Sequence, residues 1–429
     1  MDSGNSPANS SLRKTALNAL HKRLGAKMVN FGGWDMPVEY PCSGNLMCEH
    51  RAVRGGVGVF DVSHMGDIRI RGKSGERKST VDSSQLLVTE KNDPRAQPGM
   101  AVPHVQDVTN GGLAAVQHLC MNDASKLAIG QAQYSAMLYP SGTFVDDVIV
   151  HRLGEDDYLL VINAGTREKD ISWVRENTKG MDCVVEELSD AYTQLAIQGP
   201  RAAEVLQKLT DAKLDTIKNY WFTHGTVCGL PNTLIARTGY TGEDGFEIYV
   251  PSDVATSERV WNEVFAAGKE FGILACGLGA RNTLRLESKM ALYGHEISDE
   301  INVWEAGLER YCHLEKGAFV GREALVKLKA AGSRRALVGL EMVERGIARD
   351  GYRCLDSSGN EIGVVTSGSP SPTLGKNIAL AYVPPAMTGL GTEIFVEIRR
   401  QKVKAVVVGT PFYKRVRTPR AQPGMAVPR

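Results

Sequence analysis

The feature that most constrains the fold is a change in the pattern of the chain near residue 335. Beyond that point, short apolar segments rich in β-branched residues follow one another closely, with turn residues between them. Such spacing is typical of a small all-β module. The segments are RALVGLEMV, EIGVVTSG, NIALAYV, EIFVEIR and KAVVVG. We therefore predict a C-terminal β-barrel domain over residues 335–415.

The chain ahead of this module mixes helical and strand patterns, which predicts an α+β body over residues 12–330, in two subdomains. Leu17, Leu20 and Leu24 recur at helical spacing within residues 15–27, and Gly25 marks the end of that helix. Neither G-x-G-x-x-G nor a Walker phosphate loop occurs. Further strands are expected at 57–71, 144–152, 158–162 and 233–237, and further helices at 113–120, 167–176, 200–209, 254–270 and 322–330.

Composition limits the partners of the chain. Its 429 residues predict two or three domains, at roughly 150 residues per domain. Lys plus Arg number 50 and Asp plus Glu number 49, so no strong field attracts a polyanion, and we expect no nucleic-acid partner. No run of 18 apolar residues occurs, so no membrane span is expected. The polar start MDSGNSPANSS resembles neither a signal nor a transit peptide, which favours a cytoplasmic location.

Cysteine and histidine spacing gives no metal-binding pattern. The eight cysteines are scattered without a C-x-x-C pair, and we expect free thiols in a reducing compartment. His64, His295 and His313 likewise lack the spacing of metal ligands. We therefore expect no structural metal.

One sequence of ten residues, PRAQPGMAVP, occurs twice, at 94–103 and at 419–428. The flanking sequences differ, and a solenoid would need at least three stacked copies, so we do not interpret the pair as a structural repeat. The first copy lies in a polar stretch, residues 74–112, which we interpret as an insertion with little order. Disorder is also expected for residues 1–11 and for the tail, residues 416–429.

The segment GYTGEDGFEIYV, residues 239–250, combines a glycine-rich turn with three carboxylates, Glu243, Asp244 and Glu247. Strand alternation would put Phe246, Ile248 and Val250 on one face and Glu247 with Tyr249 on the other. A carboxylate beside an aromatic ring on a rigid strand suits a flat heterocycle with adjacent N–H groups. In isolation, the segment could equally be a turn that leads into a half-buried strand.

Six further segments occur with it in a fixed order: FGGWDMPVEY, GVFDVSHMGDI, MNDASKLAIGQAQYS, GLGARNTLRLES, TSGSPSPTLGKNIALAYV and PFYKR. Together they resemble the T-protein of the glycine cleavage system, a tetrahydrofolate-dependent aminomethyltransferase. The resemblance implies three domains in a ring-like arrangement, tetrahydrofolate as a substrate without any metal, and a lipoylated H-protein as the partner. It covers residues 12–415 except 74–112, a stretch that ends shortly before the best catalytic candidate.

By this resemblance, Asp123 is the catalytic carboxylate, Glu247 binds the pterin and Arg281 binds the folate. An Asn-Asp pair at this position could also simply cap a turn. Arg285, four residues after Arg281, would share its helix face or be a surface charge. Other positions that resemble the folate pocket are Met65, Tyr134, Asn163, Tyr192, Tyr413 and Arg415.

Two other functions remain open from the sequence. One is demethylation of a different small donor onto folate, and the other is folate binding without transfer. The presence of Asp123 argues against a relative that has lost its catalytic carboxylate. An insertion just upstream of Asp123 could nevertheless leave a chain that binds folate and transfers poorly.

Overall fold

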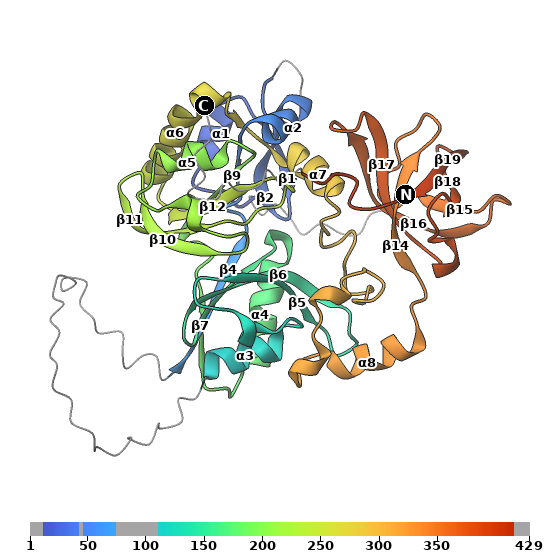
Figure 1. Ribbon diagram of the computed structural model, residues 1–429, viewed down its shortest axis with the longest axis horizontal. Coiled ribbons are helices and arrows are strands. Elements are labelled where there is room, and N and C mark those ends of the chain that lie inside the picture. Colours follow the sequence, from blue (N-terminus) through green and yellow to red (C-terminus); the bar gives the residue numbers. More distant parts are fainter. Residues whose placement is uncertain (1–11, 43–45, 74–109, 416–429) are drawn as a thin grey trace, which may run out of the picture. The chain divides into compact units, whose positions relative to one another are not determined.

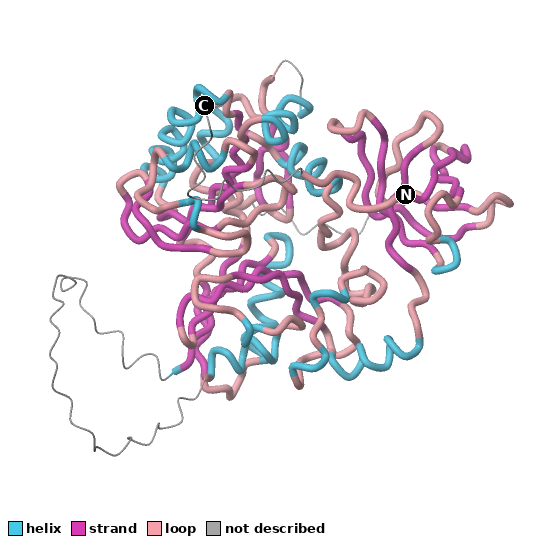
Figure 2. Tube along the Cα trace, in the orientation of Figure 1, coloured by secondary structure: helices cyan, strands magenta, loops and turns pink. Residues whose placement is uncertain are grey.

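The computed structural model describes residues 12–42, 46–73 and 110–415 (Figure 1). The chain divides into two compact units. Unit 1 comprises Met1–His64, Asp190–Glu309 and Lys327–Arg429, and unit 2 comprises Met65–Ser189 and Arg310–Val326. Helices and strands are mixed through the body, whereas the C-terminal part consists of strands joined by loops with little helix, as Figure 2 shows.

Unit 2 is built on a five-stranded antiparallel sheet in the order β5-β6-β7-β4-β8. Its core joins strand residues such as Ile68 and Leu160 to Val116 and Leu119 of α3 and to Ile171 of α4. The strands are β4 (Gly66–Gly72), β5 (Ala132–Leu138), β6 (Phe144–Gly154), β7 (Asp157–Ile162) and β8 (Cys183–Glu187), and the helices are α3 (Gly111–Leu119) and α4 (Arg167–Asn177).

The body of unit 1 contains a six-stranded sheet in the order β10-β11-β12-β9-β3-β13 and a two-stranded sheet, β1-β2. One face of the larger sheet packs with α1, α5 and α6 in a single apolar core. The strands are β1 (Lys27–Phe31), β2 (Trp34–Glu39), β3 (Gly58–Asp61), β9 (Tyr192–Gln198), β10 (Phe222–Val227), β11 (Leu230–Ala236), β12 (Gly245–Pro251) and β13 (Leu274–Ala275). The helices are α1 (Asn18–Arg23), α2 (Leu46–Gly55), α5 (Ala202–Gln207), α6 (Val254–Gly268) and α7 (Leu278–Glu287).

The C-terminal strands of unit 1 close into a barrel in the order β14-β17-β16-β15-β18-β19. Closure leaves no unpaired sheet edge, and the interior is filled by small and branched apolar side chains such as Val365, Ala381 and Val396. The strands are β14 (Ala336–Met342), β15 (Arg353–Leu355), β16 (Glu361–Ser371), β17 (Lys376–Val383), β18 (Glu393–Ile398) and β19 (Gln401–Val408). The predicted α+β class and C-terminal barrel are confirmed.

Most predicted elements are present, with shifted ends. The first helix, α1, is shorter than expected because Leu24 ends it and Gly25 adopts a left-handed φ of 75°. Residues 31–40 form most of the hairpin β1-β2, with Gly32 and Gly33 at positive φ in its turn. The helix predicted at 322–330 is α8 (Arg322–Ala331). No helix among the described residues is long and apolar enough to cross a membrane.

Two predictions require correction. Gly111 and Gly112, placed at the end of the predicted insertion, begin α3 and are buried. A side chain at Gly111 would meet the backbone oxygen of Asp182, so the packing requires glycine there. The expectation of eight free thiols was also wrong, because Cys42 and Cys48 form a disulfide. The repeated ten residues and the predicted disordered ends lie outside the described residues.

The chain segments on the two sides of residues 74–109 both form hydrogen bonds with Asp156. Its backbone oxygen accepts a hydrogen bond from Gly72 N (3.1 Å), and its carboxylate accepts bonds from Gly112 N (3.1 Å) and Leu113 N (2.7 Å). These bonds hold the two described ends of the chain together. The stretch is therefore a suitable target for deletion.

We predict that replacing residues 74–109 with a four-residue Gly-Ser linker raises the free energy of unfolding by about 1–2 kcal/mol, since each halving of a loop saves about 0.6 kcal/mol. Urea denaturation measures the change. In contrast, Asp156→Ala should lower stability by about 1–3 kcal/mol, because it removes the acceptor of two backbone N–H groups. A deletion variant less stable than the parent would show that the stretch contributes to the fold.

Candidate functional site

The predicted alternation in β12 is confirmed. Phe246, Ile248 and Val250 are fully buried in the core of unit 1, and Glu247 lies on the opposite face of the sheet. Across the ladder, Glu247 is flanked by Ala236 on β11 and by Ala196 on β9. The smallest side chain with a Cβ thus occupies both neighbouring ladder positions on this face.

Glu247 has one hydrogen-bond donor among the described residues, the hydroxyl of Thr238, which bonds to Oε2. Burial raises the pKa of the Glu247 carboxyl, while Thr238 and the nearby Arg281 guanidinium oppose that rise. Oε1 is therefore available to accept a bond from a ligand. A single carboxylate can accept two adjacent N–H groups.

Arg281 projects from α7 and lies over the ring of Tyr240, with 4.5 Å between the guanidinium carbon and the ring centroid. Arg281 also acts on His64, a fully buried residue whose ring meets Phe31 edge-on at 5.6 Å. Burial, and then the charge of Arg281, lowers the pKa of His64 to about 3, so the imidazole is neutral. Neither ring nitrogen has a hydrogen-bond partner among the described residues.

Arg285 does not share the environment of Arg281, and it is not a surface charge either. It is 1% exposed and forms an ion pair with Glu296 at 2.6 Å. It also donates to Ser367 Oγ on β16 at 2.8 Å. Arg285 is therefore a structural link between α7 and the barrel, and the expectation that it is a surface charge was wrong.

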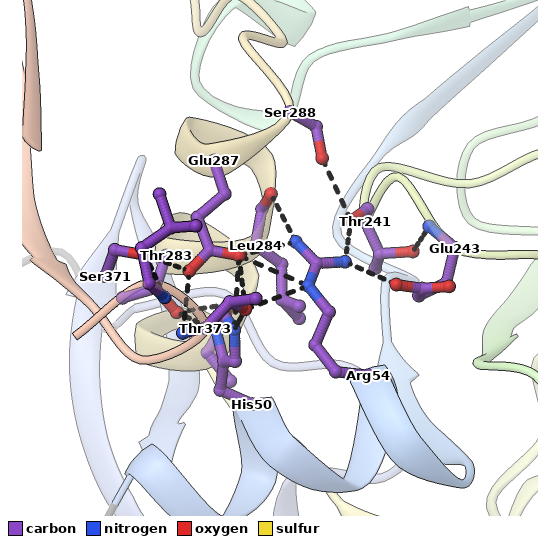
Figure 3. Close-up of polar contacts among 12 residues, drawn as sticks. His50, Arg54, Thr241, Glu243, Thr283, Leu284, Glu287, Ser288, Ser371 and Thr373 are labelled. Carbon is purple, nitrogen blue, oxygen red and sulfur yellow. Dashed lines mark hydrogen bonds and ion pairs between the residues drawn. The ribbon is translucent and has the colours of Figure 1, made fainter. Parts of the chain in front are cut away.

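A second arginine, Arg54 at the end of α2, joins three parts of unit 1 (Figure 3). It donates to Thr241 O (2.7 Å) and Glu243 Oε1 (3.0 Å) in the loop before β12. It also donates to Glu287 Oε2 (2.8 Å) at the end of α7 and to Thr373 Oγ1 (3.3 Å) after β16. A planar guanidinium carries several N–H donors that point in different directions, so it can bind acceptors from separate parts of the chain at once. Sequence reasoning missed Arg54, which lies outside every motif considered.

Glu287 is the common acceptor of this network. Its carboxylate also receives bonds from Ser371 Oγ (2.5 Å), Thr373 N (3.1 Å) and Thr373 Oγ1 (2.7 Å), and His50 Nε2 lies 3.4 Å away. Burial opposes its charge, but the contacts with His50, Ser371 and Arg54 together lower the pKa of Glu287 to about 2. The buried carboxylate is thus ionised and fully partnered.

The C-terminal residues Tyr413 and Arg415 reach the loop that precedes β12. The Tyr413 ring stacks on Arg54, 4.0 Å from the guanidinium carbon to the centroid, and Tyr413 N donates to Glu287 O at 2.8 Å. Arg415 lies 3.5 Å from Asp244. Burial, and the nearby Glu243, raise the pKa of Tyr413 to about 12. Arg415 therefore contacts the loop before β12 directly, and Tyr413 packs on Arg54, which binds the same loop.

Tyr192 is placed differently. In the ladder it pairs with Pro251, four residues along β12 from Glu247. At about 3.3 Å per residue, this offset separates the two positions by roughly 13 Å. The ring of Tyr192 packs edge-on against Tyr249 at 6.0 Å. The structure of unit 1 does not bring it next to the Glu247 carboxylate.

Asp123 lies in unit 2, where it caps the short 3-10 turn Ala124–Lys126. Its Oδ1 accepts bonds from Gln117 Nε2 (2.8 Å), Ser125 N (3.1 Å) and Ser125 Oγ (2.6 Å). Its Oδ2 has one neighbour among the described residues, the Lys126 ammonium at 3.3 Å. Burial raises the pKa, but the bonds from Ser125, Gln117 and Lys126 outweigh it and lower the pKa of Asp123 to about 2. The Asp123 carboxylate thus caps the turn through Oδ1 and keeps a negative charge that Oδ2 can present to a ligand.

Tyr134 and Asn163 meet at Asp147, also in unit 2. Asn163 Nδ2 donates to both Asp146 Oδ1 and Asp147 Oδ1 at 2.8 Å. Burial and the adjacent Asp146 raise the pKa of Asp147 to about 7, while Asn163 and Tyr134 restrain it. Met65 is half-buried and precedes Gly66, which pairs with Ile162, the residue before Asn163.

The predicted site residues therefore form two groups. Unit 1 holds Glu247, Arg281, Tyr413 and Arg415, whereas unit 2 holds Asp123, Met65, Tyr134 and Asn163. In the described parts of both units, no cluster of three or more His, Cys, Asp or Glu side chains has a geometry that could hold a metal ion.

Known proteins resemble this chain over nearly its whole length. Residues 17–81 and 109–316 match the GCVT N-terminal domain, and residues 335–414 match the glycine cleavage T-protein C-terminal barrel domain. The aminomethyltransferase of Acidobacterium capsulatum is 64% identical over 409 residues, which cover 95% of this chain and 98% of the relative. The aminomethyltransferase of Koribacter versatilis is 61% identical over 411 residues, which cover 96% and 98%.

The fold agrees with these matches. The crystal structure of glycine cleavage system aminomethyltransferase T from Bartonella henselae superposes with a TM-score of 0.80 at 31% identity, over 94% of this chain and 99% of that chain. A GCVT body followed by its barrel thus accounts for most of the residues. The chain belongs to the glycine cleavage T-protein family, and it is an aminomethyltransferase.

We predict that Glu287→Gln lowers the free energy of unfolding by about 3–5 kcal/mol at pH 7, because the buried charge of Arg54 would lose one of its two counter-ions and keep only Glu243. The depressed pKa of Glu287 means that this stabilisation is present above about pH 4.5 and is lost as the pH falls toward 2. Denaturation at pH 7 and at pH 3 measures the free energy of unfolding of the parent and the variant. The difference between these two free energies should be smaller at pH 3 than at pH 7.

The matched control is Glu309→Gln, since Glu309 is exposed. It should change stability by no more than about 0.5 kcal/mol. A Glu287→Gln variant as stable as the control at pH 7 would contradict the role of the buried network.

Proposed function

We propose that this enzyme transfers the methylene of an aminomethyl group, carried on the lipoyl arm of an H-protein, to tetrahydrofolate in glycine breakdown. Two nitrogens of tetrahydrofolate each form a bond to the methylene carbon and each lose one proton. The carbon–nitrogen bond to the departing amine and the carbon–sulfur bond to the lipoyl arm both break. One proton completes ammonia and the other completes the thiol, so no oxidant is needed.

The observation that carries the proposal is the state of the Asp123 carboxylate. Because the pKa of Asp123 is about 2, the side chain is an anion at neutral pH and does not act as a proton donor. One oxygen is held by three donors, which orients the other. Such a fixed anion can accept a bond from a folate N–H and can stabilise the positive charge that develops at the methylene.

The surroundings of Glu247 support folate as the acceptor. A carboxylate between Ala196 and Ala236 suits the edge of a pterin, which presents an N–H beside an exocyclic amine. Arg281, whose positive charge acts on Glu247, is assigned to the folate as well. We assign Tyr413 and Arg415 to the binding of the same ligand. Met65, Tyr134 and Asn163 are assigned to the surroundings of Asp123.

The family membership favours this reaction over demethylation of another donor or folate binding without transfer. The direct experiment is an ammonia-release assay with an aminomethyl-lipoyl carrier and tetrahydrofolate. Release that depends on both substrates supports the proposal, and its absence from a folded preparation that binds tetrahydrofolate would refute it.

We predict that Asp123→Asn lowers kcat by about 100- to 1,000-fold, since it removes the charge that stabilises the transition state and keeps the shape of the side chain. The dissociation constant for tetrahydrofolate should stay within about twofold. Single-turnover ammonia release and a binding titration measure the two effects. Asp299→Asn, at an exposed position, is the control, and an Asp123 variant with the turnover of that control would reject the assignment.

We predict that Glu247→Gln weakens tetrahydrofolate binding by about 10- to 100-fold, the range expected when a hydrogen bond to a charged group is lost. Because the pKa of Glu247 is raised, its carboxylate takes up a proton at a higher pH than an ordinary glutamate does. Tetrahydrofolate binding by the parent should therefore begin to weaken at that higher pH as the solution is acidified. The change in melting temperature with tetrahydrofolate concentration measures the binding. At a tetrahydrofolate concentration 100 times its Kd, about 2.7 kcal/mol of stabilisation is expected for the parent. Equal shifts for parent and variant would exclude Glu247 from the binding site.

A further inference from the structure

Gln117, near the end of α3, lies between Asp123 and a residue from a distant part of the chain, Lys316. Its Nε2 is 2.8 Å from Asp123 Oδ1, and its Oε1 is 3.1 Å from Lys316 Nζ and 2.9 Å from Ala124 N. All four residues belong to unit 2. None of the motifs in the sequence includes Gln117 or Lys316.

These contacts determine which way the Gln117 amide points. The ammonium of Lys316 and the backbone N–H of Ala124 can only donate, so the amide atom that faces them must be the oxygen. The amide nitrogen then necessarily faces Asp123. An orientation that is often ambiguous in amide side chains is here fixed by the chemistry of the neighbours.

Lys316 is itself held by the end of α3. Its Nζ bonds to Gln117 O at 2.7 Å and to Cys120 O at 2.5 Å. Both are carbonyls at the C-terminus of the helix, where backbone acceptors lack helical partners and a positive charge is favourable. The Phe319 ring lies 4.9 Å from Nζ. The ammonium thus has three oxygen acceptors in one place, which limits its movement.

We propose that Lys316 and Gln117 are positioning residues for Asp123. Lys316 fixes the Gln117 amide, and the amide, together with Ser125, occupies Oδ1 of Asp123. Oδ2, whose neighbour among the described residues is the exposed Lys126 ammonium at 3.3 Å, then faces the substrate. This inference rests on the proposed role of Asp123 in transfer. Neither residue needs to touch a substrate.

The arrangement depends on the proton of Lys316. Burial lowers the pKa of Lys316 to about 8, while Cys120, Asp123 and Cys312 favour its charged form. The other titratable neighbour, His118, has a pKa lowered by burial and by Lys316. Lys316 is therefore charged below about pH 8. Above that pH the neutral amine no longer binds Gln117 Oε1 as a charged donor, and Ala124 N alone still imposes the orientation of the Gln117 amide.

The test uses the full-length enzyme in the ammonia-release assay. Lys316→Met should lower kcat by about 10- to 100-fold, the scale expected from misplacing a catalytic group, with the KM for tetrahydrofolate within about twofold. Gln117→Leu should give a similar loss, and the double variant should lose little more, because the two residues act in one chain of contacts.

Lys316→Arg supplies a readout that a purely structural role would not change. It should retain kcat within about threefold at pH 7. The fall in kcat that we expect near pH 8 for the parent should be absent, since arginine stays protonated. Lys179→Met, at an exposed position in the same unit, is the matched control and should behave as the parent. Thermal denaturation identifies any variant that fails to fold.

Parent-like kcat and pH dependence in both Lys316→Met and Gln117→Leu would overturn the proposal. If Lys316→Met does not fold, Gln117→Leu decides the outcome alone. Failure of this proposal can be distinguished from failure of the proposed function. If only the positioning role is wrong, Asp123→Asn still abolishes transfer. An Asp123→Asn variant with full turnover would overturn both.

Discussion

The constraint on which much of unit 1 depends is the burial of the Glu287 carboxylate. A buried charge is tolerated only when partners replace its hydration, and Glu287 obtains them from α2, through Arg54 and His50, and from the barrel, through Ser371 and Thr373. Satisfying this one group therefore requires the barrel, the end of α7 and the end of α2 to meet. The same contacts hold Tyr413 beside the loop that leads to Glu247.

Two carboxylates proposed for one reaction lie in opposite environments. Asp123 accepts several hydrogen bonds, which keep its pKa near 2 and its charge permanent. Glu247 is buried with a single hydroxyl donor, so its pKa is raised and it depends on a ligand to complete its hydrogen bonds. A permanent anion suits charge stabilisation, whereas an under-satisfied carboxylate suits recognition of N–H groups. The division of roles thus follows from the number of donors that each side chain receives.

Local patterns predicted the elements better than the contacts between them. Alternation correctly placed Glu247 opposite Phe246 and Ile248, because strand geometry leaves each side chain only one of two faces. Helical spacing, in contrast, did not predict that Arg285 is buried. The direction in which Arg285 points is decided by Glu296 and Ser367, which no periodicity reveals. The pairing of Cys42 with Cys48 was likewise missed, since spacing alone does not distinguish a bonded pair from free thiols.

The sequence by itself determined the α+β body, the C-terminal barrel and the candidate status of Asp123 and Glu247. These depend on periodicity and on motifs within short stretches. Only the tertiary structure disclosed Arg54, Gln117 and Lys316. Lys316 lies almost 200 residues from Gln117 in the chain, and Arg54 is about as far from Glu243. Contacts across such separations arise when buried charges find partners during packing, and that requirement leaves no local pattern in the sequence.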